Sequence, residues 1–188
     1  MIGAVVGSGG KTTLIKNLAQ KYRAEGKNVL VTTTTHMFIE EDTLLTDEAD
    51  DIIRALEERG MVMGGVPEGI KIKALSPETF EAVTAVADVV LVEADGSKHM
   101  PLKFPNATEP VIPPKVEEII VVWGPHGLGN PARKVCHRLA LVMDCLGIDG
   151  DTPITREHVA QLLDKGYLKP LRQQYPDAKI EVYPKLFQ

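Results

Sequence analysis

Seven consecutive residues near the start of the chain, Gly7-Ser8-Gly9-Gly10-Lys11-Thr12-Thr13, have the types and spacing of a phosphate-binding loop. In such a loop small residues bring backbone N–H groups close to the phosphates, a lysine reaches the β- and γ-phosphates, and a threonine hydroxyl ligates Mg²⁺. We predict that the N–H groups from Ser8 to Thr12 face a nucleoside triphosphate, that Lys11 is a catalytic cation and that Thr12 is a metal ligand. The alternative is a flexible Gly/Ser turn.

The residues on either side favour phosphate binding over that alternative. Ile2 to Val6 is a short apolar run typical of a strand, and a helical pattern follows the loop. A strand, a glycine-rich turn and a helix, in that order, are what the motif requires. One departure is that the strict motif has glycine where this chain has Val5.

Two carboxylates follow another apolar run, Asp88 to Glu93. Glu93 and Asp95 are two residues apart, so on an extended backbone their side chains point the same way. They come at the carboxyl end of a predicted parallel strand, where open α/β sheets bind ligands. Both are predicted catalytic residues, Asp95 holding magnesium and Glu93 polarising a water, with the reverse assignment left open. The alternative is that one of them caps the following turn.

Other polar residues near predicted strand ends are candidates for contacts to a substrate. Thr32 to Thr35 end the second strand, and strand propensity alone explains this run about as well as a role in binding does. Two lysines in the segment after Asp95 could bind an anionic substrate or the γ-phosphate. The predicted substrate contacts are Thr34, His36, Lys98, His99 and Lys103.

A metal site built from softer donors is the less favoured reading of the histidines. His36 and His99 are each followed by a methionine, and Cys136 and His137 add further donors. The pairs lack metal-ligand spacing such as Cys-x-x-Cys, so we expect polar histidines and core sulfur atoms.

Alternating strand and helix patterns position these residues. Apolar runs without polar alternation indicate parallel strands covered on both faces. We predict a three-layer α/β fold, a mostly parallel sheet with helices on both faces, as a single domain over residues 1–188. The predicted strands include 2–6, 28–34, 61–64, 70–75, 88–93, 119–123 and 180–183, and the predicted helices include one ending near Gly26, 47–59, one capped by Ser76, one holding both Cys136 and Cys145, and one capped by Thr155.

Composition excludes several classes of protein. The chain of 188 residues has a net charge of −5, and its sequence offers no basic patch. Nucleic acid is therefore not an expected partner. With 2 cysteines the chain lacks the pattern of a secreted disulfide framework, and it contains no apolar run long enough to span a membrane. We therefore expect a cytoplasmic protein without a membrane partner.

Several motifs together resemble the YqeC family of selenium cofactor biosynthesis proteins, accessory to selenium-dependent molybdenum hydroxylases. The resemblance is carried by residues 6–13, 32–37 and 93–103, and further by Cys136-His137-Arg138 and Asp151-Thr152-Pro153-Ile154-Thr155. It implies a P-loop NTPase fold, ATP or GTP with Mg²⁺, and a nucleotide-dependent maturation role toward a molybdenum hydroxylase or its cofactor. The tail from Tyr183 to Gln188 lacks the Asn-Lys-x-Asp signature of guanine recognition, and ATP and GTP both stay open.

Three functions fit these residues. The first is hydrolysis of a nucleoside triphosphate coupled to maturation of another protein or its cofactor, which the carboxylates favour. The second is a small-molecule kinase whose segment between Lys98 and Lys103 holds the acceptor. The third is a nucleotide-regulated binding module without turnover, whose proline-rich segment contacts the partner.

Overall fold

The computed structural model describes residues 1–186, and the chain forms two compact units. The first unit contains Met1–Val5, Thr12–Asp95 and Val111–Glu117, and the second contains Val6–Lys11, Gly96–Pro110 and Glu118–Gln188. Residues 187 and 188, which belong to the tail compared above with the guanine signature, lie outside the described residues. The single domain stays a prediction.

The first unit is built on a mostly parallel sheet with the strand order β1-β7-β2-β5-β6-β3. Strand β7 pairs in parallel with both β1 and β2, β5 pairs in parallel with β2 and β4, and the β6 pairings are antiparallel. The strands are β1 (Ile2–Gly7), β2 (Val29–Thr33), β3 (His36–Phe38), β4 (Leu44–Leu45), β5 (Met61–Glu68), β6 (Lys71–Lys73) and β7 (Val89–Glu93).

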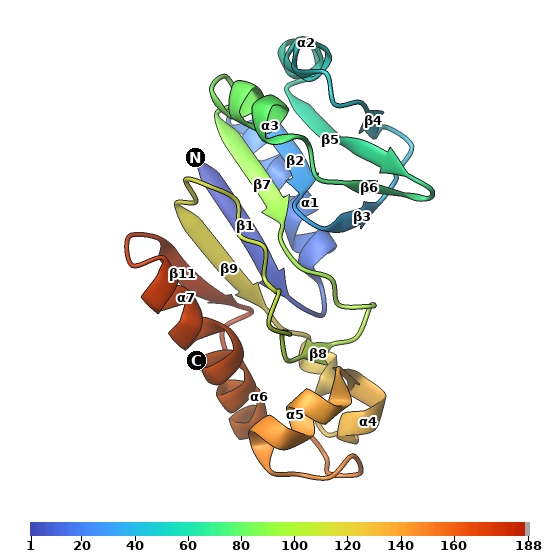
Figure 1. Cartoon of the computed structure of the whole chain (residues 1–188), viewed down its shortest axis with the longest axis vertical. Helices are drawn as coiled ribbons and strands as arrows, with labels where there is room; N and C mark the ends of the chain where they lie inside the picture. The colour runs from blue at the N-terminus through green and yellow to red at the C-terminus, as the bar shows by residue number, and fades with distance from the viewer. Residues whose placement is uncertain (187–188) are drawn as a thin grey trace. The chain divides into compact units, whose positions relative to one another are not determined.

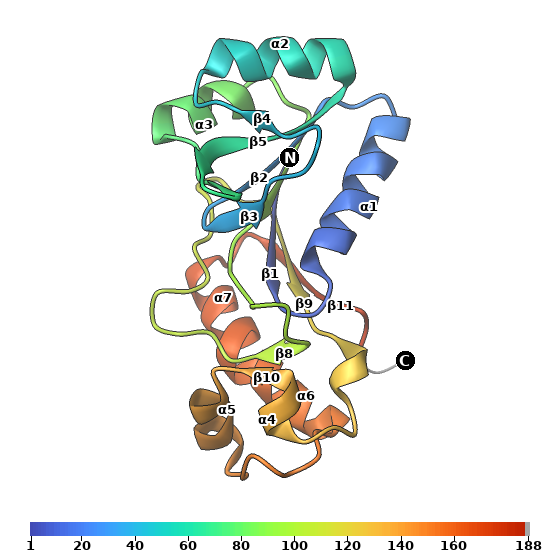
Figure 2. The same ribbon diagram turned by 90° about the vertical axis from the view of Figure 1, so that its right-hand side faces the viewer.

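Helices cover both faces of this sheet. Helix α1 (Lys11–Ala24) lies on one side of the strands and α3 (Pro77–Thr84) on the other, as Figure 2 shows, while α2 (Ala49–Arg59) packs against α3. One core cluster joins the α2 and α3 side chains to the sheet; it includes Ile2, Leu30, Ile52, Ala55, Leu56, Val62, Val83, Val90 and Val92. The predicted three-layer α/β arrangement is confirmed in this unit.

Local signals in the sequence set the ends of these helices. Gly60 follows α2 with a φ of 70°, a left-handed conformation that glycine adopts without strain, and its N–H bonds to the Leu56 carbonyl. Ser76 caps α3 by accepting a hydrogen bond from the Thr79 N–H, and Pro77 is the first helical residue. Both boundaries agree with those expected from the sequence.

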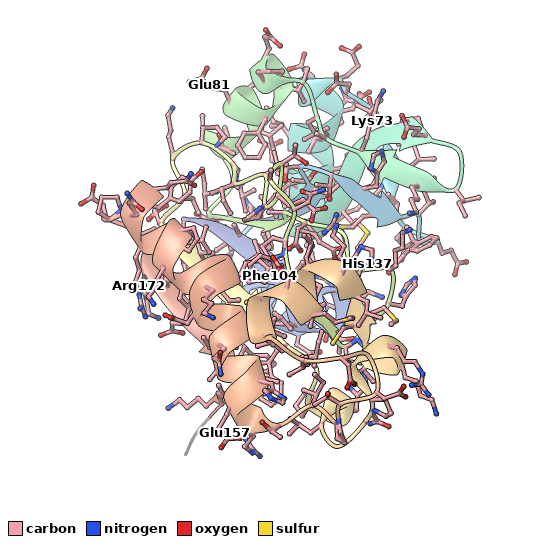
Figure 3. All side chains as sticks on the ribbon, turned by 60° about the horizontal axis from the view of Figure 1, so that its bottom comes forward. Lys73, Glu81, Phe104, His137, Glu157 and Arg172 are labelled. Carbon is pink, nitrogen blue, oxygen red and sulfur yellow. The ribbon has the colours of Figure 1, made fainter. Side chains whose placement is uncertain are left out.

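The second unit contains two small strand pairs and a helical segment. Strand β9 (Glu118–Val122) pairs in parallel with β11 (Lys179–Tyr183), and β8 (Leu102–Lys103) pairs with β10 (Cys136–His137). Helix α6 (Arg156–Leu163) continues through a π-helical turn, Asp164–Leu168, into α7 (Lys169–Gln174). This run lies near β9 and β11 in Figure 1, and Glu157 and Arg172 are exposed on it (Figure 3).

The prediction of one helix holding both cysteines is wrong. Helix α4 (Ala132–Val135) ends at Cys136, Cys136 and His137 form β10, and α5 (Leu139–Leu146) begins after Arg138. Arg138 has a φ of 58°, which breaks the helical path, and β10 is held in register with β8. A pairing 34 residues away in sequence therefore overrode the local helical pattern.

The proline-rich segment from Pro101 to Pro114 leads into a strap of the first unit, residues Val111–Glu117, which is fixed at both ends. At one end the Val111 N–H donates to the Ala94 carbonyl, and at the other the Glu117 N–H donates to the Ile2 carbonyl. The strap therefore runs across the first unit from Ala94, directly after β7, to Ile2 at the start of β1.

Truncating the core of α2 should test this packing. Leu56 is 2% exposed, so we expect Leu56→Ala to lower the free energy of unfolding by about 3 kcal/mol, because it leaves a cavity. The neighbouring exposed Glu57 provides the control, and Glu57→Ala should change stability by less than about 0.5 kcal/mol. Urea denaturation followed by circular dichroism measures both variants, and equal losses would contradict the packing described.

Candidate functional site

In the first unit, three strand ends meet at one edge of the sheet. Because β7 lies between β1 and β2, Glu93 is the register partner of both Val5 and Thr33. The Thr33 hydroxyl donates to the Glu93 carbonyl at 2.8 Å, and the Thr34 N–H donates to the same oxygen at 3.2 Å. Val5, where the strict motif has glycine, is a fully buried strand residue. The predicted site residues Thr34 and Glu93 are thus brought together.

The same edge brings Thr12 to one of the two carboxylates. The Thr12 hydroxyl donates to Glu93 Oε2 at 3.0 Å, and Thr12 itself is exposed. Asp95, two residues further along, is 0% exposed, whereas Glu93 is 8% exposed. The carboxylate beside the predicted metal-ligating hydroxyl is therefore that of Glu93.

The glycine-rich loop has a backbone that requires its glycines. Gly7, Gly9 and Gly10 have φ values of 92°, 80° and 127°, and helix α1 begins at Lys11. A Cβ on Gly9 would lie 2.5 Å from the Cα of Gly124, and a Cβ on Gly7 would lie 2.1 Å from the Val122 carbonyl oxygen. Both contacts are far too short, so these two positions need glycine for close backbone approach.

Two polar side chains hold the loop within the second unit. Ser8 is 2% exposed; its N–H donates to the Val122 carbonyl at 2.9 Å and its hydroxyl donates to the Pro101 carbonyl at 3.1 Å. The Lys11 ammonium donates to the Gly7 carbonyl at 2.8 Å across the turn. The prediction that the N–H series begins at Ser8 is therefore corrected, because that N–H is already bonded inside the protein.

The remaining candidate substrate residues lie in different surroundings. The Thr34 hydroxyl donates to the Val111 carbonyl at 2.6 Å, and His36 contacts Glu68 of β5 with Nε2 and Oε2 2.7 Å apart. Lys98 and His99 are exposed, with φ values of 48° and 60°. Two consecutive non-glycine residues in the left-handed region make an uncommon turn. Their substrate roles stay predictions.

Lys103 belongs to a buried ionic cluster in the second unit. Its ammonium donates to the Gly96 carbonyl at 2.6 Å and to Glu109 Oε2 at 2.9 Å, and Arg138 donates to the same oxygen at 2.6 Å. Burial alone would raise the pKa of the Glu109 carboxyl, but the hydrogen bonds and charges of Arg138 and Lys103 lower it to about 2. Lys103 is thus engaged inside the protein.

Sequence reasoning missed Glu109 as a partner of Lys103. The glutamate lies in the proline-rich segment, where no helical or strand periodicity predicts which way its side chain points. The spacing of six residues between the two gave no helical or strand signal either. Arg138 was noted only as part of a motif.

The sulfur and imidazole groups near this cluster are not arranged as a metal centre. Burial raises the pKa of the Cys136 thiol to about 11, which keeps it protonated. Burial, together with the charges of Arg138, Lys103 and Lys98, lowers the pKa of His137. Among residues 1–186, no group of three or more histidine, cysteine, aspartate or glutamate side chains has the arrangement of a metal site.

An apolar cavity of about 390 Å³ lies beside the threonine strand end in the first unit. Thr33 and Thr34 line it together with α3 and the strap. Lys115 of the strap and Glu81 of α3 form an exposed ion pair at 3.1 Å, and Figure 3 shows Glu81 on that helix. The apolar side chains that line it include Ile2, Leu75, Phe80, Pro113 and Pro114. Its size and lining are those of a small-molecule pocket.

Comparison with known proteins identifies the family. The sequence model of one family, described as YqeC protein, matches residues 3–140. The chain belongs to the YqeC family. A relative named as the uncharacterized protein YqeC of Escherichia coli (strain K12) is 34% identical over 177 residues, covering 85% of this chain and 66% of the relative. The chain thus spans just under two thirds of that YqeC protein. No solved structure matches the chain significantly.

None of the helices in residues 1–186 is both long enough and apolar enough to cross a bilayer.

Alanine substitutions at Gly9 and at Gly10 should separate the effect of close backbone approach from that of backbone strain. Gly9→Ala should lower the free energy of unfolding by about 3 to 5 kcal/mol, because overpacking adds to the strain of its positive φ. A Cβ on Gly10 meets no atom within 4 Å, so Gly10→Ala should cost only about 1 to 2 kcal/mol of strain. Chemical denaturation of both variants measures the difference, and a larger loss for Gly10→Ala would contradict the loop geometry.

The Glu109 cluster should make stability depend on acid pH. The folded-state pKa, about 2, lies below the ordinary 4.5, so the stabilisation is complete above about pH 4.5 and is lost as pH falls toward 2. Glu109→Gln should remove this dependence and cost about 3 kcal/mol at pH 7, because Lys103 stays buried without its carboxylate. Chemical denaturation at several pH values measures the free energy of unfolding of the wild type and of Glu109→Gln. The same carboxylate-to-amide change at the exposed Asp177 is the control and should leave the pH profile as it is. A wild-type pH profile in Glu109→Gln would disprove the role of the cluster.

Proposed function

We propose that the chain binds a magnesium nucleoside triphosphate at Gly7–Thr13 and hydrolyses it, acting as a maturation factor for selenium-dependent molybdenum hydroxylases. The observation that carries the proposal is the hydrogen bond of 3.0 Å between the Thr12 hydroxyl and the Glu93 carboxylate. It joins the hydroxyl expected to ligate Mg²⁺ to an acidic residue at the carboxyl end of a strand. That pairing is what a metal held between a phosphate loop and a neighbouring strand requires.

The loop supports this proposal through its backbone and its charge. A Cβ on Gly10 would meet no atom within 4 Å, so the main chain is open there to approaching phosphate oxygens, and α1 begins directly after it. Lys11 lies against the Gly7 carbonyl, so its ammonium is held at the turn that the phosphates would occupy. Gly9, Gly10, Lys11 and Thr12 are the proposed N–H donors, and Thr13 lies one residue further along α1.

The two carboxylates are proposed to have different roles in hydrolysis. Glu93 is the proposed magnesium-side carboxylate because of its bond to Thr12, whereas the sequence favoured Asp95 and left the reverse assignment open. Asp95 is fully buried two residues on, and we propose that it orients the groups around the attacking water. Bound Mg²⁺ would neutralise the charge that develops on the phosphate oxygens.

The maturation role rests on family membership and on the motif resemblance. Residues 3–140 match the YqeC family model, a span that holds the loop, the threonine run and both carboxylates. A molybdenum hydroxylase or its cofactor is the proposed partner, and ATP and GTP are both candidate nucleotides.

Calorimetric titration with ATP and GTP, with and without Mg²⁺, tests the binding step. Lys11→Ala should abolish measurable binding, because the loop loses the cation that meets the β- and γ-phosphates. Lys21 is an exposed lysine on the same helix, and Lys21→Ala should bind as the wild type does. Wild-type affinity in Lys11→Ala would refute the loop assignment.

Phosphate release separates the roles of the carboxylates. Glu93→Gln should weaken the dependence of nucleotide affinity on Mg²⁺, whereas Asp95→Asn should lower turnover about a hundredfold with nucleotide affinity unchanged. The opposite pattern would restore Asp95 as the metal-side residue. Binding without turnover under all conditions would favour the regulated binding module.

The apolar cavity beside Thr33 and Thr34 favours one further candidate, a small-molecule kinase. Its volume of about 390 Å³ suits a small acceptor next to the strand end that carries Glu93. Nucleotide turnover that depends on an added small molecule would support the kinase over the maturation factor.

A further inference from the structure

A second and larger cavity, of about 670 Å³, lies in the first unit between α1 and β5. It is lined along α1 by Lys16, Ala19 and Arg23, and along the other wall by Met61 and Met63 of β5. Neither the nucleotide loop nor the predicted catalytic carboxylates contribute to it. The cavity therefore needs its own explanation.

The floor of this cavity is apolar and adaptable. Ala19 and Val31 are buried, at 1% and 3% exposure, while Met61 and Met63 are partly exposed. The two methionines are separated by one residue on β5, so their side chains point to the same face of the sheet. Flexible thioether side chains can pack against ligands of varied shape, and they contact aromatic rings favourably.

The two ends of the cavity carry opposite charges. At one end Lys16 and Glu40 form an ion pair at 2.7 Å, and Glu41 and Asp42 lie beside it. Arg23 lies at the other end, seven residues and about 10 Å further along α1. Acidic side chains at the first end disfavour a second anionic group there, so the cavity does not suit a polyanion such as a nucleoside triphosphate.

Two arginines meet at the cationic end. Arg59, the last residue of α2, lines the cavity with Arg23, whose Cγ lies 3.8 Å from where a Cβ on Gly60 would be. Neither guanidinium forms an ion pair within residues 1–186. A position in the last turn of a helix explains a single arginine through the helix dipole. Two guanidinium groups at the end of one apolar-floored cavity form a better fit to an anion.

We propose that this cavity binds a small organic anion with a flat apolar body. The single anionic group, a carboxylate or a phosphate monoester, is held by Arg23 and Arg59, and the apolar body lies over Met61 and Met63. This site is separate from the proposed nucleotide site and does not depend on nucleotide binding.

Three probes with the same ring distinguish the anionic groups. These are 1-naphthoate, 1-naphthyl phosphate and the uncharged 1-naphthamide, each titrated into nucleotide-free protein labelled at its methionine methyl groups with carbon-13. The methyl resonances of Met61 and Met63 should shift and saturate, while those of Met100 and Met143 in the second unit should not. Both anions should bind at least tenfold more tightly than the amide, and the tighter anion identifies the preferred group.

Arginine variants test whether charge recognition occurs at this end. Arg23→Gln and Arg59→Gln should each weaken binding of the two anions about tenfold and leave binding of the amide unchanged. Arg54→Gln, on the exposed face of α2 where it pairs with Asp51, is the matched control and should bind both anions normally.

The proposal is overturned if Met61 and Met63 do not shift at saturating anion, or if both arginine variants keep wild-type affinity. Lys11→Ala separates this result from the nucleotide proposal, because that variant should lose nucleotide binding and still bind the naphthyl anions. If Lys11→Ala lost both, the two ligands would share one site and the separate cavity would be refuted.

Discussion

The parallel register of β1, β7 and β2 is the constraint on which the candidate site depends. It makes Glu93 the partner of Val5 on one side and of Thr33 on the other. A slip of one residue would turn the Glu93 side chain to the opposite face of the sheet, away from the Thr12 hydroxyl. The same strand explains Val5, which stands where the strict motif has glycine. Because β1 extends to Gly7, Val5 is a buried strand residue.

Elements defined by local signals could be predicted from the sequence, and those defined by distant pairing could not. The apolar runs of β1, β2 and β7, the stop at Gly60 and the cap at Ser76 each depend on neighbouring residues. The two-residue strand β10 depends instead on its pairing with β8, and Cys136 and Cys145 were wrongly joined in one helix for that reason. Helical spacing alone carries no information about a partner strand.

In the candidate site, too, local spacing could be recognised in the sequence, whereas contacts between distant residues could not. The glycine loop and the carboxylates could be predicted as candidates because their spacing within a few residues is itself the chemical signal. The choice between Glu93 and Asp95 depended on burial and on the position of Thr12, 81 residues away from Glu93. The pairing of Lys103 with Glu109 and Arg138, and the cavity floored by Met61 and Met63, arise only when the chain has folded.

The strap, Val111–Glu117, has a consequence for how the protein is made. It completes the first unit, yet it follows the segment Gly96–Pro110, which belongs to the second unit. During synthesis on the ribosome, the hydrogen bond from Glu117 to Ile2 in the first unit therefore cannot form until Gly96–Pro110 has been synthesised. Contacts so distant in sequence slow folding, so the first unit is completed late.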